Sequence, residues 1–232
     1  MDYAIIAAGE GSRLAQEGIG CPKPLVPLNG VPLIERLIRI FARHNARSIS
    51  IIINSRQSET QRLLTALAAQ FPLNIVVKDT PSSMHSMHAL APYLRRGRFC
   101  LTTVDTIFGE EQFGAYIEAF ENSTSDGLMA VTDFIDDEKP LYVSTTPDLR
   151  ITGFHDTPPK EIQYISGGIY ALSPASLDTL EKCIAAGEAR MRNFQRRLVA
   201  EGHKLDAYPF GKIIDIDHAE DIKKAEEFIG SL

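Results

Sequence analysis

The 232-residue sequence has few cysteines, no excess of positive charge and no long hydrophobic run. Its three cysteines lie far apart and form no CxxC pair, which excludes a disulfide framework and gives no support to a zinc or thioredoxin-type site. With 24 basic and 30 acidic residues, the net charge of −6 argues against general nucleic-acid binding but leaves room for a small anionic ligand in a locally basic pocket. No apolar run approaches about 18 residues, so we expect no membrane span.

The first residues, MDYAIIAAGEGSRL, carry no basic leader and no long apolar stretch before the glycines, so we do not expect a signal peptide. Together with the sparse cysteines, this predicts a cytoplasmic protein. Apolar residues make up 44% and charged residues 23%, as in an average globular protein, and a chain of this length buries roughly 70% of its unfolded surface. There is no internal repeat and no low-complexity linker, so we expect one domain over residues 1–232.

The first two-thirds of the sequence alternates strand-like and helix-like segments. Short apolar runs predict strands at 4–8, 48–54, 73–78 and 98–104. Helical spacing of apolar residues predicts helices at 31–46, 57–70, 84–94 and 110–122. This order predicts an α/β fold of three layers, with a mostly parallel sheet covered by helices on both faces.

The last third has a different pattern, which adds antiparallel strands and makes the predicted sheet mixed. Strands are expected at 127–133, 141–145, 149–154, 162–172, 205–208 and 212–216. Helices are expected at 174–186, 189–201 and 218–229. Ser173 is the expected N-cap of the helix at 174–186, with Pro174 in its first turn.

A glycine-rich segment, Gly9-Glu10-Gly11-Ser12-Arg13, follows the first predicted strand. Ligands of open α/β sheets bind beyond the carboxyl ends of the strands, and glycines there let backbone N–H groups approach phosphate oxygens. The segment is not a Walker A motif, because no GK[ST] follows, and Leu14 stands where a dinucleotide fingerprint has its third glycine. Alone, the segment fits a glycine-rich turn without a ligand equally well.

A second cation follows in Pro22-Lys23-Pro24. Prolines on both sides restrict the backbone and remove competing donors. Arg13 can bind phosphate oxygens with two N–H groups, and Lys23 supplies a compact point charge, so the pair suits a polyphosphate. The alternative is two surface cations beside a turn.

These segments resemble the signature of the nucleotidyltransferases, AAGxGxRL…PKPLxPLxGxPLI, which stands here at 7–14 and 22–34. The resemblance implies a Rossmann-like nucleotidyltransferase fold. It also implies transfer of a nucleoside monophosphate from an NTP to a phosphorylated acceptor, often a sugar 1-phosphate, with release of pyrophosphate. The implied nucleotide-binding residues are Ala8, Gly9, Gly11, Ser12, Arg13, Lys23 and Ser83. Of these, Arg13 would stabilise the departing pyrophosphate and Lys23 the α-phosphate.

The same resemblance implies a Mg²⁺ ion held by carboxylates. Asp105 ends the fourth predicted strand and resembles the metal-binding aspartate of the family, although Val104 replaces the usual glycine before it. Asp215 and Asp217 compete for the second position. Asp217 fits an N-cap, with Glu220 completing a capping box, whereas a carboxylate at Asp215 ends an apolar strand and is costly unless it is paired or metal-bound. We therefore assign Asp105 and Asp215 to the metal.

The acceptor site is less clearly marked. Gly168 lies in Ser166-Gly167-Gly168, which resembles a family segment where glycines let the acceptor approach a strand. Lys160 is the candidate for the second lysine of sugar-nucleotide members, with Lys139 as an earlier alternative. His85 and His88 lie three residues apart and could share a helix face beside the pocket, but they lack a third ligand for zinc.

The function we expect is Mg²⁺-dependent formation of an NDP-sugar from an NTP and a sugar 1-phosphate. An alternative is a cytidylyltransferase acting on phosphocholine or a similar amino-alcohol phosphate. A non-catalytic nucleotide-binding domain is the alternative of another class, although it would not need both metal carboxylates. A metal-dependent glycosyltransferase would more often carry a DxD motif, which is missing around Asp105. The sequence leaves the base, the acceptor and the oligomeric state open.

Overall fold

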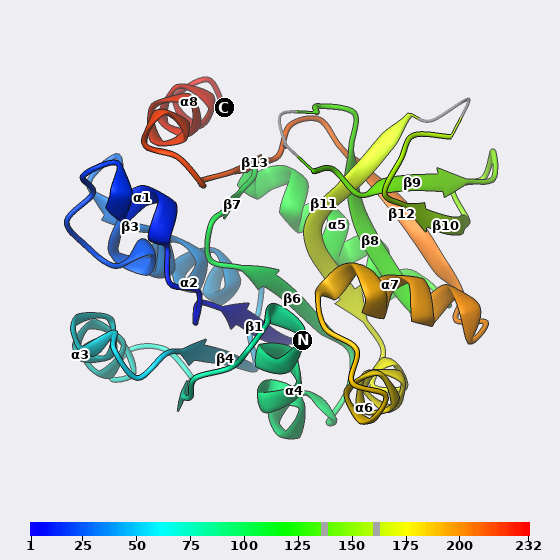
Figure 1. The fold of residues 1–232 in the computed structure, drawn as a ribbon, viewed down its shortest axis with the longest axis horizontal. Coiled ribbons are helices and arrows are strands. Elements are labelled where there is room, and N and C mark those ends of the chain that lie inside the picture. The colour runs from blue at the N-terminus through cyan, green and yellow to red at the C-terminus, as the bar shows by residue number, and fades with distance from the viewer. Residues whose placement is uncertain (136–138, 160–162) are drawn as a thin grey trace.

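Parallel strands form one half of the sheet in the computed structural model, which describes residues 1–135, 139–159 and 163–232 (Figure 1). The parallel strands are β1 (Asp2–Ile6), β4 (Ser48–Ile53), β5 (Leu73–Val77) and β6 (Phe99–Thr103). β1 lies between β4 and β6, and β5 pairs with β4 at the edge. Runs such as SISIII are almost entirely buried, as expected for strands covered on both faces.

The other half of the nine-stranded sheet is mixed, as the sequence predicts. β11 pairs antiparallel with β6, β8 and β9, while β12 pairs parallel with β8. β10 completes the edge beyond β9. The bounds of these strands are β8 (Gly127–Thr132), β9 (Tyr142–Thr145), β10 (Ile151–His155), β11 (Tyr164–Leu172) and β12 (Leu205–Phe210).

Helices cover both faces of the sheet, which confirms the predicted three-layer α/β/α fold. The α-helices are α1 (Ser12–Gln16), α2 (Leu33–Arg43), α3 (Ser58–Leu67), α4 (Ser83–Leu94), α5 (Glu110–Asn122), α6 (Ser176–Ala185), α7 (Met191–Ala200) and α8 (Ala219–Gly230). Tyr3 and Ile5 of β1 pack into a core with α2, α3, α5 and α8, whereas Ala4 and Ile6 face α4, α6 and α7. Successive side chains of a strand point to opposite faces, so one strand serves both cores.

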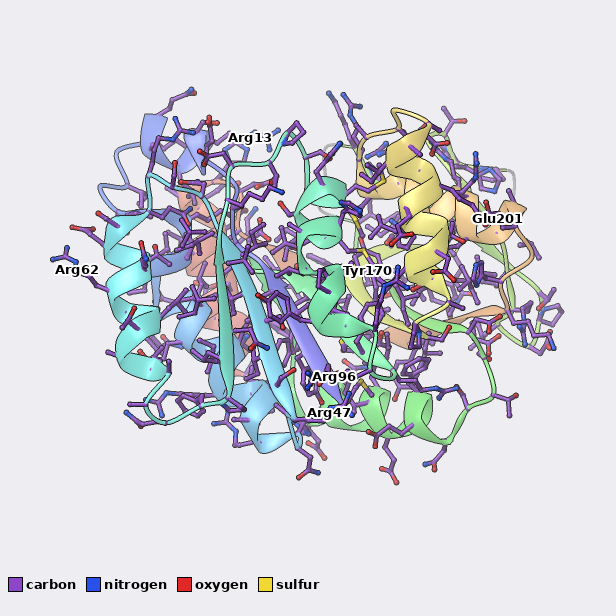
Figure 2. The ribbon with its side chains drawn as sticks, turned by 90° about the horizontal axis from the view of Figure 1, so that it is seen from below. Arg13, Arg47, Arg62, Arg96, Tyr170 and Glu201 are labelled. Carbon is purple, nitrogen blue, oxygen red and sulfur yellow. The ribbon has the colours of Figure 1, made fainter. Side chains whose placement is uncertain are left out.

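Short elements complete the chain. A 3₁₀ turn covers Lys23–Leu25, and two small two-stranded sheets form outside the large one. They pair β2 (Pro27–Leu28) with β3 (Val31–Pro32), and β7 (Thr106–Ile107) with β13 (Ile214–Asp215). In Figure 2, Arg13 and Arg47 lie at opposite ends of the strands, with α4 across them. Arg47 pairs with Asp2 at the start of β1, so Arg13 marks the carboxyl-terminal edge.

The predicted N-cap Ser173 is wrong. α6 begins at Ser176, its N-cap is Ala175, and the Ser173 hydroxyl is buried without a partner among the described residues. The backbone makes a tight turn instead, in which the N–H of Ser176 donates to the Ser173 carbonyl at 3.1 Å.

The described helices include none long and apolar enough to cross a membrane.

Candidate active site

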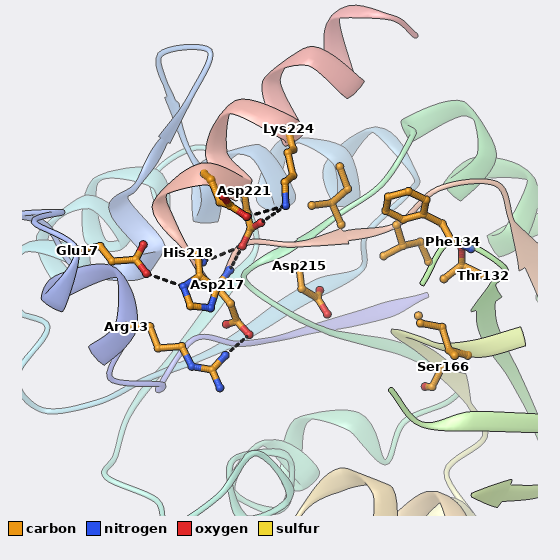
Figure 3. Close-up of a pocket in the computed structure, with 15 residues that line it drawn as sticks. Arg13, Glu17, Thr132, Phe134, Ser166, Asp215, Asp217, His218, Asp221 and Lys224 are labelled. Atoms are coloured by element: carbon orange, nitrogen blue, oxygen red, sulfur yellow. Dashed lines mark hydrogen bonds and ion pairs between the residues drawn. The ribbon is translucent and has the colours of Figure 1, made fainter. Parts of the chain in front are cut away.

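Two adjoining cavities lie at the carboxyl-terminal edge of the parallel strands. The first, which we call the phosphate-loop cavity, has a volume of about 610 Å³ and is lined by all seven residues assigned to the nucleotide and by Asp105. The second, the α8 cavity, has a volume of about 550 Å³ and lies between α8 and β11 (Figure 3). Arg13 and Asp217 line both cavities. The structure thus brings the predicted nucleotide-binding residues together at one edge of the sheet.

The loop after β1 requires glycine at Gly11. Its φ of +62° lies in the left-handed region, and a Cβ built there would lie 3.0 Å from the Cβ of Lys23. The close approach explains why the glycine segment and the Pro-Lys-Pro segment occur together: the loop packs directly against Lys23. Ser12 and Arg13 follow in the first turn of α1.

Lys23 and Arg13 are both paired with carboxylates. The Lys23 ammonium pairs with Asp105 and, at 2.9 Å, with Asp217, and the side chain is only 10% exposed. Burial alone would lower the pKa of Lys23, but the charges and hydrogen bonds of the two aspartates outweigh it and raise the pKa above its usual value. Arg13 donates to the other oxygen of Asp217 at 3.0 Å and is half exposed. Two cations and their carboxylate partners therefore meet in the cleft.

The small sheet of β7 and β13 brings the predicted metal carboxylates together. Asp215 pairs with Thr106, the residue after Asp105, and the N–H of Ile216 donates to the Asp105 carbonyl at 3.1 Å. Ile214 and Ile216 are buried, so the alternation of the strand turns Asp215 toward the cleft. Desolvation by the surrounding protein atoms, and next the charge of Asp105, raise the pKa of the Asp215 carboxyl, although the residue is still exposed to solvent.

The pair of carboxylates fits a hard divalent cation. Mg²⁺ prefers oxygen ligands and is usually bound by one or two carboxylates plus substrate phosphates and waters. The repulsion that raises the pKa of Asp215 beside Asp105 is the kind of repulsion that a cation relieves. Among the described residues no group of three histidine, cysteine or acidic side chains could hold a metal, so such an ion would depend on the substrate phosphates for its remaining ligands. The metal assignment stays a prediction.

Asp217 is not the predicted N-cap of the last helix. The N-cap of α8 is His218, and Asp221 accepts from the His218 N–H at 2.8 Å. Glu17 reaches across from beyond α1 and accepts from the N–H of Ala219 at 2.6 Å. Because these two acids satisfy the first N–H groups, the Asp217 carboxylate is left to pair with Arg13 and Lys23 (Figure 3).

Hydroxyl groups form the wall of the phosphate-loop cavity opposite the glycines. Ser83 is the first residue of α4, and Ser82, its N-cap, lies 2.8 Å from Nδ1 of His85. Thr80 and Ser86 join the lining, with their hydroxyls 2.6 Å apart. His85 therefore helps to fix the start of α4, while the structure gives no such role to His88.

The predicted acceptor residues are only partly placed. Gly168 has a φ of +74°, and a Cβ there would meet the Thr106 hydroxyl at 3.3 Å, but its neighbours Ser166 and Gly167 line the α8 cavity. Lys160 lies outside the described residues. Lys139, the alternative, lines a surface pocket between the start of β9 and α7 rather than either cavity of the cleft.

Residues that the sequence did not single out complete the cleft. Phe134 and Thr132 line the α8 cavity, and Asn54 and Gln57 hold the loop after β1 from behind. The two amides lie just after a strand that is parallel to β1, which was the signal that could have indicated them.

Comparison with known proteins agrees with this geometry. The profile of the MobA-like NTP transferase domain matches residues 3–202. The chain belongs to this family. It is therefore a nucleotidyltransferase domain, which confirms the resemblance drawn from the sequence. The chain spans about half the length of the first curated relatives it matches.

Three relatives show the range of the family. The bifunctional protein GlmU of Methanococcus maripaludis is 23% identical over 97% of this chain and 53% of its own length. A glucose-1-phosphate cytidylyltransferase of Salmonella typhimurium is 23% identical over 78% of each chain. A 2-aminoethylphosphonate cytidylyltransferase of Lancefieldella rimae is 26% identical over 46% of this chain and 44% of its own.

The fold has close structural relatives. A Bacillus anthracis structure, described as a glucose-1-phosphate thymidylyltransferase in complex with sucrose, superposes with a TM-score of 0.85 at 19% identity. The match covers 100% of this chain and 96% of the other, which supports the nucleotidyltransferase fold predicted from the sequence.

Proposed function

We propose that the chain transfers a nucleoside monophosphate from an NTP to a sugar 1-phosphate, forming an NDP-sugar and releasing pyrophosphate. The observation that carries the proposal is the meeting of Arg13 and Lys23 with Asp105 and Asp215 in one cleft beside a glycine-rich loop. A cytoplasmic location, which the sequence predicts, agrees with the use of an NTP as the substrate.

The chain's own residues act by positioning and by charge. Backbone N–H groups of the loop after β1 and the two cations bind the triphosphate, with Lys23 at the α-phosphate and Arg13 at the departing pyrophosphate. A phosphate oxygen of the acceptor attacks the α-phosphorus in line, so that one P–O bond forms while the bond to pyrophosphate breaks. Asp105 and Asp215 would hold Mg²⁺, which supplies charge neutralisation between the two phosphate-bearing substrates.

Binding of the NTP requires an exchange of partners. Asp217 pairs with both Arg13 and Lys23. Phosphate oxygens must take over these contacts, and the displaced carboxylate then faces the cleft. The carboxylate of Asp217 stabilises the folded protein, because two partly buried cations without partners would destabilise it.

The sugar assignment rests on the polar lining of the α8 cavity and on the Salmonella typhimurium relative, which is named for glucose 1-phosphate. Ser166 and the acidic side chains along α8 offer hydroxyl and carboxylate groups, which hydrogen-bond readily to sugar hydroxyls. Gly167 lets Ile213, which also lines this cavity, pack directly against β11, because a Cβ at Gly167 would overlap the Cδ1 of Ile213.

A second candidate is an acceptor that carries an amine, such as phosphocholine or an aminoalkyl phosphonate. One observation favours it: the carboxylates along the α8 cavity outnumber the lysine and arginine side chains, and the aromatic ring of Phe134 lines the same space. Acidic and aromatic side chains together attract an ammonium group. The Lancefieldella rimae relative is named for 2-aminoethylphosphonate.

Pyrophosphate release tests the proposal. The purified protein is incubated with Mg²⁺ and each of the four NTPs, crossed with hexose 1-phosphates, phosphocholine and 2-aminoethylphosphonate. Release that depends on a hexose 1-phosphate supports the first candidate, and release that depends on an amine-bearing acceptor replaces it with the second. Turnover of an NDP-sugar with release of NDP would contradict both.

Matched variants separate the site from the fold. Asp105→Asn should abolish pyrophosphate release. Asp178→Asn, the same change at an exposed position of α6, should leave release within about twofold because surface changes away from a site have small effects. Full activity of Asp105→Asn with Mg²⁺ would overturn the metal assignment.

A further inference from the structure

The turn after β4 holds three consecutive residues of the loop after β1. The Asn54 side chain donates from Nδ2 to the Ala8 carbonyl at 3.0 Å, and the Gln57 side chain donates from Nε2 to the Gly9 carbonyl at 3.1 Å. Arg56, between them, pairs with the next residue, Glu10. Asn54 and Gln57 are 6% and 5% exposed, whereas the Arg56–Glu10 pair lies on the surface.

These two hydrogen bonds fix the direction of two peptide groups. In a trans peptide the carbonyl and the following N–H point in opposite directions, because the unit is planar. A carbonyl of Ala8 that faces Asn54 therefore turns the N–H of Gly9 away from Asn54. In the same way, the bond from Gln57 turns the N–H of Glu10 away from the turn after β4. Both residues line the phosphate-loop cavity.

We propose that Asn54 and Gln57 are positioning residues that aim the N–H groups of Gly9 and Glu10 at the triphosphate of the NTP. The inference rests on the proposed function and adds residues that lie behind the site rather than in it. Among the described residues, neither N–H has a hydrogen-bond acceptor, so both are available to phosphate oxygens.

The Asn54 amide is itself fixed in position and direction. The N–H of Ala7 donates to Ile52 at 2.9 Å, which continues the register of β1 and β4 and sets Asn54 beside Ala8. Oδ1 of Asn54 accepts from the Arg56 N–H at 3.0 Å, so the amide cannot turn over without losing two bonds. Asn54 therefore presents a donor of fixed direction.

Gln57 also has a destabilising feature, which its proposed role explains. Its Oε1 is buried and has no partner among the described residues. A buried amide oxygen without a hydrogen bond destabilises a fold, and an apolar side chain of similar volume would avoid this. A glutamine at this place is reasonable when its Nε2 is needed on the Gly9 carbonyl.

The test uses Gln57→Met and Asn54→Leu, which keep the approximate volume and remove the donor without adding charge. Arg56→Ala is the matched control, since it releases the loop's side-chain contact and leaves both peptide groups held. We expect each amide variant to raise the Kd for pyrophosphate and the KM for the NTP by about tenfold or more, the effect of a misdirected hydrogen bond to a charged group. The KM for the acceptor should stay within about twofold in the amide variants. In Arg56→Ala, the Kd for pyrophosphate and the KM for the NTP should also stay within about twofold.

A structural role alone would lower the Tm and leave the Kd for pyrophosphate unchanged, and that result would overturn the inference. A measurement on the unchanged protein does not depend on how the variants fold: ¹⁵N-resolved NMR during addition of pyrophosphate should move the amide proton signals of Gly9 and Glu10 downfield. Binding of pyrophosphate without these shifts overturns the inference alone. No binding of pyrophosphate or of any NTP to the unchanged protein overturns the proposed function and this inference together.

Discussion

Gly11→Ala should damage the site far more than it damages the fold. Gly11 has a φ of +62°, and the added methyl group would lie 3.0 Å from the Cβ of Lys23. This contact is with the root of the lysine side chain, which cannot swing away, so the Lys23 segment must move by a few tenths of an ångström. Gly18→Ala is the matched control, because Gly18 has a φ of +90° and no heavy atom within 4 Å of the added Cβ.

Both variants meet the backbone penalty for a left-handed alanine, about 1–2 kcal/mol. For a chain of this size, each kcal/mol lowers the Tm by about 2–4 °C, so we expect a fall of about 2–8 °C in each. Only Gly11→Ala moves Lys23. Since a displacement of about 1 Å near reacting groups costs on the order of a hundredfold, a shift of a few tenths should lower kcat/KM by roughly tenfold.

The assay pairs thermal unfolding with pyrophosphate release, measured on the NTP and acceptor that the panel identifies. We expect similar Tm losses in the two variants and a loss of kcat/KM in Gly11→Ala alone. Equal kcat/KM in the two variants would refute the claim that the loop positions Lys23.

Three further predictions follow from particular contacts. Gly167→Ala brings a methyl group against Ile213 in the wall of the α8 cavity, so the acceptor KM should rise while the NTP KM stays unchanged, which steady-state kinetics would show. Tyr116→Phe leaves two buried backbone groups, now bonded to its hydroxyl at 2.6 and 2.7 Å, without a partner, and should cost roughly 1–3 kcal/mol for each in urea unfolding. The hydrogen bonds of Arg47 and Ser48 lower the pKa of Asp2 below 3.8 against the opposing effect of burial, so its contribution is present above pH 3.8 and is lost as the pH falls through the lowered value. Asp2→Asn should therefore be less stable at pH 7, and the difference should vanish in strong acid.

Much of the fold could be predicted because single strands and helices have patterns that can be recognised in the local sequence. The run SISIII is short and rich in β-branched residues, which favours a strand covered on both faces, and the helical spacing from Leu33 to Phe41 matches the buried face of α2. The phosphate-binding role of the loop glycines and of the Pro-Lys-Pro segment could also be predicted, because these residues occur at a specific spacing in the sequence.

The N-cap of α8 could not be predicted, because it depends on residues far away in the sequence. At the start of α8, Asp217 and Asp221 are four residues apart, and both fit the pattern of an acid near a helix N-terminus. Which of them receives the N–H groups depends on Glu17, some 200 residues earlier, and on the two cations that Asp217 meets. Asn54 and Gln57 were missed for the same reason, because their partners are carbonyl groups of the loop after β1, more than 40 residues earlier in the sequence.

The most direct test of nucleotidyl transfer is ³¹P NMR of the complete reaction with acceptor whose phosphate oxygens carry ¹⁸O. We expect pyrophosphate and a nucleoside diphosphate ester in equal amounts, with ¹⁸O in the bridge of the ester and none in the pyrophosphate. Unchanged NTP signals in a sample where the NTP binds, or ¹⁸O in the pyrophosphate, would contradict it.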